Sequence, residues 1–492
     1  MKKIIFIFMI AGTFIIHFSC TDFLKEAPKS FVAPGQFYRT DVELNAGAIG
    51  VYHDITKLFG GQPSLDGLQW DLNYFLHYGT DIARPTGGRE AQYAFHIYTL
   101  SVATEGSIPD LWRIFYRGIA NANNLIEGAS NATDASGNMK SQITAEGMFY
   151  RAFYYYYLTV FWGNVPFIDK FDTNYATSGL SQTAVGDIRK RMISDLENSC
   201  NNLPNESADN YKGRPTRWAA KMLLCKYYLW EKEWTKTSQL CEEIIIESPH
   251  ALLDDYADLW GEEHEYNRES IWELDFVQHT FIQHRTTQMC PRGMDESTTD
   301  PALGSAFTGY GLLTATQEFF TTLDLNDKRR IWYRWLDEDP RVDFKFNYVA
   351  KFLDKPERMI RGNSGVNVLV YRLADTYLMQ AEAENELNNG PTPKAYERIN
   401  VIRNRAGLSA LNGRNKTEFF LDIMDERKWE LAFEYHRKPD LCRWNKLVEV
   451  VQAMMTSNPD GAQYVQPHHQ LLPIPSKEIV KNDNLKQNPG YD

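Results

Sequence analysis

A charged run near the C-terminus holds the densest group of side chains that could do chemistry. Glu426, Glu430 and Glu434 recur at four-residue spacing, so a helix would place their carboxylates on one face. Three arginines occur in the same run: Arg427, Arg437 and Arg443. An acid–base site is one interpretation, since carboxylates serve as general acids and bases. The spacing favours the other interpretation, in which guanidinium groups fork toward the acids and an ion-pair lattice joins the last helices.

Signatures of the common enzyme classes are missing from the sequence. It contains no GxxxxGK[ST] loop, no GxSxG turn, no HExxH pair and no CxxC motif. His279, His284, His468 and His469 lie in loop-like segments, and their spacing favours solvated histidines over metal ligands. A glycoside hydrolase needs only two carboxylates at a set separation. With 64 acidic residues, the sequence leaves that class open.

The composition indicates an acidic globular protein. The 492 residues are 43% hydrophobic and 24% charged, enough for one large or two ordinary domains with a buried core. The net charge of −12, with no basic stretch interleaved with aromatics, argues against nucleic-acid binding. Of six cysteines, five lie beyond Cys20, and that odd number without CxxC spacing predicts neither a disulfide framework nor a thiol catalyst.

The first 20 residues have the layout of an export signal. Two lysines precede an apolar run at residues 4–16, and Ser19 and Cys20 follow. The run is shorter than the ~20 apolar residues that span a bilayer. A cysteine at the cleavage point indicates a bacterial lipoprotein, so we predict that Cys20 carries lipid. His17 departs from the usual lipobox, which has Leu, Val or Ile there. Removing residues 1–19 would change the net charge to −14.

The elements that would position these groups are mostly helices. Apolar residues recur at three- and four-residue steps, and Ser/Thr starts and Gly-Pro stops divide the pattern into segments. Helices are expected at 41–58, 142–162, 233–247, 370–388, 393–406, 417–438 and 441–455. Three more are expected to begin at 107, near 183 and near 216.

Two segments lack a helical period and predict a loop-rich layer beside the helices. They are residues 60–106 and 249–365, and short strands are expected within the second, at 271–276 and 348–352. The tail at 467–492 is expected to be a loop. The fold class is therefore all-α, mainly helical, with irregular tetratricopeptide-like helix pairs, a large loop-rich insertion and a few short strands.

Motifs that occur in order along the chain carry a family resemblance. The first is CTDFL at 20–24, followed by WRIFY at 112–116, EGMFYRAFYYYYL at 146–158 with FWGNVP at 161–166, and GRPT at 213–216. Later come YRLAD…AEA at 371–383, IN.IRNRAG at 399–407, the charged run at 426–444, LPIP at 472–475 and QNPGY at 487–491. Together they resemble the SusD/RagB family of nutrient-capturing outer-membrane lipoproteins.

The resemblance implies a role and a location. Members are non-enzymatic and lie as a lid on a SusC-like TonB-dependent transporter, to which they deliver oligosaccharides or, in some branches, peptides. The chain would then need no cofactor and no metal. It would be lipid-anchored at the cell surface in the outer membrane. Three regions are expected: a signal peptide at 1–19, an N-terminal SusD-like region at 20–248, and a C-terminal SusD/RagB region at 249–492, the last two packed as one unit. The alternatives are a peptide-binding RagB-like member and a surface-anchored glycoside hydrolase.

A sugar binder combines aromatic rings, which stack on C–H faces, with polar groups that bind hydroxyls. The loop-rich regions supply both. The predicted ligand-binding residues are Asp81, Arg84, Arg89, Tyr93, Tyr310, Trp332 and Trp335. Trp332 or Trp335 would be the stacking platform. If the segment is helical these two rings share a face, whereas in an extended chain Trp332 and Tyr333 point to opposite sides. For each ring, the alternative is packing of a loop onto the helices.

Overall fold

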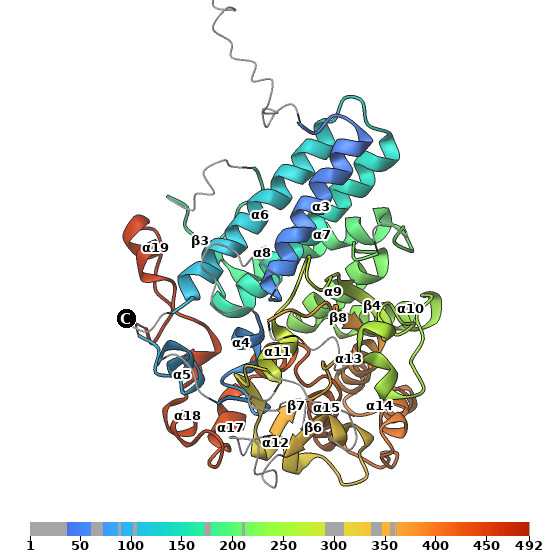
Figure 1. Cartoon of the computed structure of the whole chain (residues 1–492), viewed down its shortest axis with the longest axis vertical. Helices are drawn as coiled ribbons and strands as arrows, with labels where there is room; N and C mark the ends of the chain where they lie inside the picture. The colour runs from blue at the N-terminus through green and yellow to red at the C-terminus, as the bar shows by residue number, and fades with distance from the viewer. Residues whose placement is uncertain are drawn as a thin grey trace, which may run out of the picture.

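The computed structural model describes residues 37–60, 72–86, 90–101, 106–171, 179–208, 212–290, 309–335, 347–354, 360 and 362–491. It is mainly helical with a few short strands, which confirms the predicted fold class. Figure 1 shows α3 (Asp41–Leu58), α6 (Ile108–Asn131) and α7 (Gly137–Trp162) side by side in its upper part. None of the helices in the described ranges is long and apolar enough to cross a membrane.

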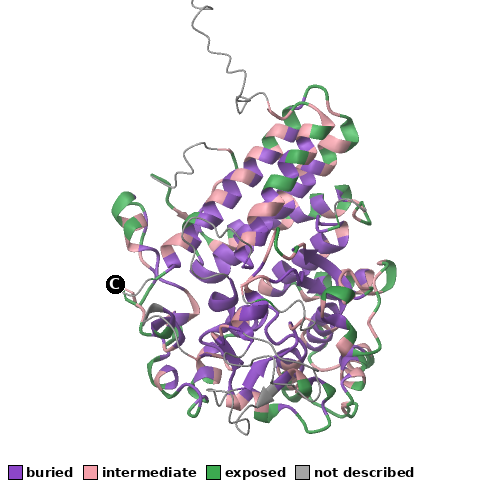
Figure 2. Ribbon diagram, in the orientation of Figure 1, coloured by how far each residue is buried: buried purple, intermediate pink, exposed green. Residues whose placement is uncertain are grey.

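The N-terminal half of the frame is a run of long helices. They are α3 (Asp41–Leu58), α6 (Ile108–Asn131), α7 (Gly137–Trp162), α8 (Val185–Asn202), α9 (Arg217–Trp230) and α10 (Trp234–Glu247). Each helix from α6 to α9 packs on the one that follows it, so the row ends at α10, and α3 packs on α6 and α7. Because neighbours cover α7 on several sides, every residue from Phe149 to Trp162 is buried (Figure 2), and its tyrosines form the aromatic core.

Helix ends follow local capping chemistry. Thr40 and Glu43 form a capping box at the start of α3, and Thr216 accepts the N–H of Ala219 at the start of α9. Helix α7 begins at Gly137, five residues before its predicted start, because the Ser136 hydroxyl caps it. The predicted start of α6 is confirmed, although the Ser107 side chain makes no capping bond.

The C-terminal half contains shorter helices. They are α13 (Leu373–Leu387), α14 (Pro393–Arg405), α15 (Lys416–Glu430), α16 (Arg437–Arg443), α17 (Leu447–Gln452), α18 (Pro459–Tyr464) and α19 (Ser476–Lys481), with the 3₁₀ helix η8 (Pro467–Gln470). The predicted helix at 417–438 was wrong in its length. It ends at Glu430, because Phe433 and Tyr435 adopt positive φ angles of 63° and 71°. The tail, predicted as loop, holds η8 and α19.

Within the described residues, three small antiparallel sheets complete the frame. The largest has the order β1-β5-β7-β6, from Ala83–Pro85, Leu313–Ala315, Asn347–Val349 and Tyr333–Trp335. Strand β4 (Ser270–Leu274) pairs with β8 (Val368–Arg372), and β2 (Val165–Pro166) pairs with β3 (Gln182–Thr183). Residues 370–372 were predicted to be helical, but they form the end of β8. Every residue of this strand is buried, and its valines favour a strand. Strands near 271 and 348 are confirmed.

The loop-rich regions are more ordered than the sequence predicts. They also contain α4 (Leu72–His77), α5 (Glu90–His96), α11 (Arg285–Met289), α12 (Gln317–Thr322), η4 (Tyr256–Leu259), η5 (Glu262–His264) and η6 (Lys328–Trp332). These elements are three to seven residues long, too short for a helical period to be visible.

A buried ion-pair lattice joins the loop layer to α15, which confirms the structural interpretation of the charged run. Glu430 is fully buried and accepts hydrogen bonds from Arg329, Arg372 and Arg405. The predicted partners were wrong: Arg427, Arg437 and Arg443 bind other acids, at positions 375, 440, 81 and 382. Glu434 lies beyond the end of α15, yet Arg372 and Lys351 still hold its carboxylate.

Candidate functional site

The four-stranded sheet brings the two loop-rich regions together. Strand β1 comes from the first region, and β5, β7 and β6 come from the second. In register, Ala83 lies opposite Ala315, and Asn347 lies opposite both Ala315 and Trp335. Arg84 and Trp335 are therefore on the two edge strands, about 14 Å apart across three strand spacings. The sheet assembles in one layer the segments that were predicted to form the binding site.

Trp332 is the last residue of η6, and contacts hold both its backbone and its ring. Its carbonyl accepts the N–H of Ala350 at 2.8 Å, and its half-buried ring packs against the main core. Arg329 in the same short helix is fully buried and binds Glu426 and Glu430 at 2.7 and 2.8 Å. The segment is neither wholly helical nor wholly extended, because η6 changes to β6 at Tyr333. The ion-pair lattice thus positions the loop that carries Trp332.

Tyr310, Arg84 and Tyr93 lie near the surface of this layer. Tyr310 is half-buried and stacks on His284 with ring centroids 6.4 Å apart. Arg84 is half-buried, and burial lowers the pKa of its guanidinium while Glu318 opposes that shift. Tyr93 on α5 is 49% exposed and donates a hydrogen bond to Asp460 at 3.0 Å. Aromatic faces and a cation are therefore available within reach of solvent.

Asp81 is bound within the fold. It lies just before β1, and Arg437 donates two hydrogen bonds to its carboxylate at 2.8 and 2.6 Å. Burial opposes ionisation of Asp81, but the Arg437 charge holds its pKa below the usual value. Its visible role is to fix the entry to β1. Arg89, Cys20 and the side chain of Trp335 lie outside the described residues, so those three predictions stay predictions.

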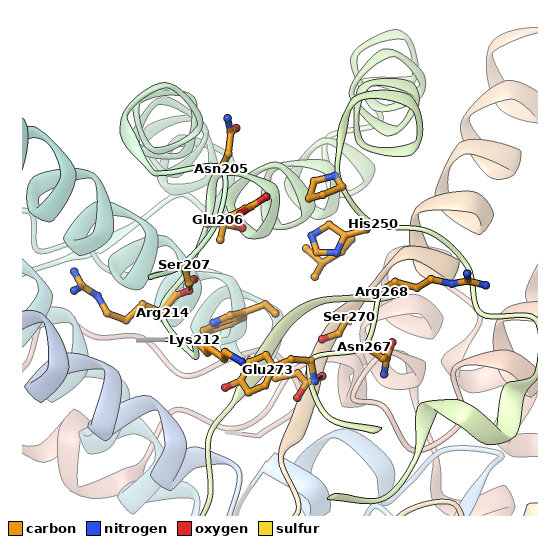
Figure 3. A pocket seen from close by; sticks show the side chains of 15 residues that line it. Asn205, Glu206, Ser207, Lys212, Arg214, His250, Asn267, Arg268, Ser270 and Glu273 are labelled. Atoms are coloured by element: carbon orange, nitrogen blue, oxygen red, sulfur yellow. Dashed lines mark hydrogen bonds between the residues drawn. The ribbon is translucent and has the colours of Figure 1, made fainter. Parts of the chain in front are cut away.

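A polar pocket of about 300 Å³ lies between the helical frame and β4. Figure 3 shows its labelled side chains around one space, with Asn205 and Glu206 from the α8–α9 connection, His250 from the segment after α10, and Lys212 and Glu273 on the remaining sides. Tyr266 and Trp272 also line it, and we call it the Tyr266 pocket. No sequence pattern indicated this site, because its lining residues come from separate connections that only the fold brings together.

Three carboxylates, Glu265, Glu273 and Asp275, gather beside the Tyr266 pocket. Burial raises the pKa of Glu265 to about 8 and that of Glu273 to about 7, and it also raises the pKa of Asp275. Asn367 donates its backbone N–H to Glu265 at 2.7 Å and its side-chain amide to Glu273 at 3.1 Å. Within the described ranges, no group of three or more His, Cys, Asp or Glu side chains is arranged to hold a metal ion.

A larger pocket, of about 460 Å³, lies where α7, α8 and α9 meet the C-terminal tail. Several of its polar side chains already hold the fold together. Asn164 accepts the N–H of Val185 at the start of α8, and Asn488 donates to the carbonyls of Trp162 and Leu472. The remaining wall is mostly apolar, so this pocket offers few polar groups to orient a ligand.

Comparisons with known proteins agree along the whole chain. A family model described as SusD family matches residues 339–491, and one described as "starch-binding associating with outer membrane" matches residues 69–229. SusD-like protein P25 of Formosa agariphila is 32% identical, with 99% of each chain covered. SusD-like protein P2 of the same organism is 26% identical, covering 96% of this chain and 97% of that one.

Solved structures share the fold. A laminarin-binding SusD-like protein has a TM-score of 0.79 at 25% identity, covering 92% of this chain and all of that one. Surface glycan-binding protein A from Bacteroides thetaiotaomicron, solved with laminarihexaose, has a TM-score of 0.75 at 21% identity. It covers 91% of this chain and 99% of that one.

Proposed function

The chain belongs to the SusD family, and we propose that it is a surface glycan-binding protein that captures oligosaccharides for a SusC-like TonB-dependent transporter. Two observations support the glycan as ligand. The chain shares its fold with a laminarin-binding SusD-like protein over 92% of its length, at 25% identity. Its β1-β5-β7-β6 layer also combines a half-buried Trp332 ring with half-buried Arg84 and partly exposed Tyr93.

The proposed binding site is the face around this sheet. Trp332 or Trp335 supplies the stacking ring, and Arg84, Arg89, Tyr93 and Tyr310 supply further contacts to the sugar. Asp81 acts indirectly by holding β1 through Arg437. Sugar rings stack on aromatic faces, and charged donors form the stronger hydrogen bonds to hydroxyls. An aromatic side chain held on short, fixed elements can bind a sugar by stacking, and this binding does not need the two catalytic carboxylates of a glycoside hydrolase.

Surface location and partner complete the proposal. The outer membrane is the compartment named by the family model that matches residues 69–229. Lipid on Cys20 would hold the chain there, because its acyl chains bury apolar surface in the bilayer, and the transporter would add a further contact. No catalytic step is proposed, and the glycan would pass on intact.

A glycan panel tests the proposal. The mature chain without its lipid, from residue 21 onward, is run by affinity electrophoresis through gels that contain single polysaccharides. New reducing ends are assayed in parallel. We expect retardation by at least one glycan and no product. Product formation would identify a hydrolase instead. Binding of a peptide mixture with no glycan retardation would identify a peptide-binding member.

A further inference from the structure

The Tyr266 pocket is separate from the β1-β5-β7-β6 sheet, since none of its lining residues belongs to that sheet. Its volume of about 300 Å³ is at the small end of the range of known ligand sites. A space of this size suits one or two rings better than a long chain.

Tyr266 is held in an unusual position at this pocket. Its φ angle is 52°, a left-handed conformation that aromatic residues rarely adopt. Glu273 accepts its backbone N–H at 2.9 Å, and Asp275 accepts its phenolic hydroxyl in a short hydrogen bond. Backbone outliers of this kind cluster at ligand sites, where surrounding contacts keep a side chain in place. The two carboxylates thus fix both ends of the Tyr266 residue.

The wall behind Tyr266 is closely packed. Trp272 is 2% exposed, and its indole N–H donates to the carbonyl of Gly213 at 2.8 Å. A β-carbon on Gly213 would lie 2.1 Å from the Tyr52 hydroxyl and 2.9 Å from Asp275. These contacts fix the position of Trp272 in the wall of the pocket.

Glu206 and Lys212 are charged rim groups of opposite sign, beside Arg214 and Arg268, which form ion pairs with Glu146 and Asp254. Glu206 and Lys212 are both exposed and line the pocket (Figure 3), and neither forms an ion pair with another described residue. The ammonium of Lys212 lies 5.5 Å from the centre of the Tyr266 ring. His250 is half-buried, and burial lowers its pKa, so its ring is neutral at pH 7. The rim therefore presents both a strong acceptor and a strong donor.

This mixture selects the class of ligand. An anion would meet Glu206 and a cation would meet Lys212, whereas a hydroxyl can donate to the first and accept from the second. A neutral ring with several hydroxyls and an apolar face fits the acid, the base and the Tyr266 ring together. We propose that the Tyr266 pocket is a second subsite that binds a neutral sugar residue, a proposal that rests on the glycan-binding function above.

Two subsites on one chain would change how a polymer is held. Once one part of a glycan is bound, the second site meets another part at high effective concentration, which raises avidity without new contacts. Short oligosaccharides that cannot reach both sites would lack this gain.

Hydrogen–deuterium exchange separates the two sites. The mature chain is mixed with laminarihexaose, cellohexaose, maltohexaose or xylohexaose, each at millimolar concentration. We expect slower exchange in the peptides that cover 205–208 and 264–274 with at least one sugar. In Lys212→Ala, and separately in Glu206→Ala, the sugar concentration for half-maximal protection should rise at least fivefold. Lys190→Ala, at an exposed lysine of α8, is the matched control and should equal the parent.

The outcomes distinguish the two proposals. Protection only around β1 and β6 refutes the second subsite and leaves the proposed function in place. Protection only at the Tyr266 pocket supports the subsite and refutes the assignment of the sheet. No protection by any of the four sugars counts against both. Equal protection in the parent and in Lys212→Ala also overturns the subsite, because exposed Lys212 can be truncated without disturbing the fold.

Discussion

Replacing Glu430 by glutamine removes one charge from the centre of the buried lattice and keeps the shape of the side chain. In the parent, the carboxylate accepts from Arg329 at 2.8 Å and from Arg372 and Arg405 at 2.6 Å each. Glu430→Gln leaves three buried guanidinium groups with less negative charge around them. Removing one partner of a buried ion pair typically costs about 3–5 kcal/mol, and we expect a loss of that size.

The pH dependence gives a second signature. Burial opposes ionisation of Glu430, but Arg405, Arg372 and Arg329 together hold its pKa well below the usual value. A lowered folded-state pKa contributes stability that is present above the unfolded value of about 4.3 and is lost as the pH falls below it. The difference between parent and Glu430→Gln should therefore be full at pH 7. It should be smaller by about 1 kcal/mol at pH 3.5.

Urea unfolding followed by circular dichroism measures both signatures. The matched control is Asp425→Asn on the same helix, where the acid is 48% exposed and pairs with Lys428. Exposed pairs contribute about 0–1 kcal/mol, so this control should nearly match the parent. If Glu430→Gln loses no more free energy of unfolding than Asp425→Asn, the lattice does not stabilise the frame as described.

Three further perturbations test other parts of the structure. Burial raises the pKa of Glu265 to about 8, above its unfolded value, so the parent should lose stability as the pH rises from 5 to 8. Glu265→Gln should show a shallower loss in urea titrations, and parallel slopes would contradict this. Gly118→Ala would place a methyl group 2.2 Å from the Tyr154 ring and should cost about 1–3 kcal/mol by thermal or urea unfolding. Gly186→Ala, with nothing within 4 Å, should not destabilise, and equal losses in both variants would refute the close α6–α7 contact. Cys20→Ala should move the chain from the membrane to the soluble fraction in cells lacking the transporter, and unchanged fractionation would argue against lipidation.

Long helices could be predicted because their signals are local. The apolar period and the cap residues lie within one helix, and so the bounds of α3, α10 and α14 and the start of α9 match the expectations within a residue or two. Segments of three to seven residues, such as α4 and β1, carry too few residues to show a period. The helical pattern at 417–438 continued past the real end of α15, since nothing local marks Phe433 and Tyr435 as left-handed.

The charged run shows why partners could not be predicted. Glu426 and Glu430 were expected to interact with Arg427, Arg437 and Arg443 of the same charged run, because those are the neighbours a linear pattern can show. Their partners Arg329 and Arg372 lie more than 50 residues earlier in the chain, and tertiary packing alone brings them together. The same limit applies to the Tyr266 pocket, whose walls come from three separate connections.

The candidate binding residues could be predicted only in part. Aromatic and polar composition pointed to two loop-rich regions, and the structure pairs segments of both in one sheet, with Arg84 and Trp335 on its two edge strands. Composition could not show that Asp81 is bound by Arg437, because that arginine lies 356 residues away in sequence. Nor could it choose between helical and extended geometry at Trp332, where a 3₁₀ turn changes to a strand.

Calorimetric titration with a glycan selected by the electrophoresis panel tests the central claim most directly. The parent should bind. At least one of Trp332→Ala and Trp335→Ala should bind more weakly by about 1–3 kcal/mol, by analogy with base stacking on aromatic side chains, which is roughly a 5- to 150-fold rise in Kd. Ile246→Ala, which truncates an exposed side chain of α10, should bind like the parent. Folded Trp332→Ala and Trp335→Ala proteins that both keep the affinity of the parent would contradict the claim that this sheet face holds the glycan.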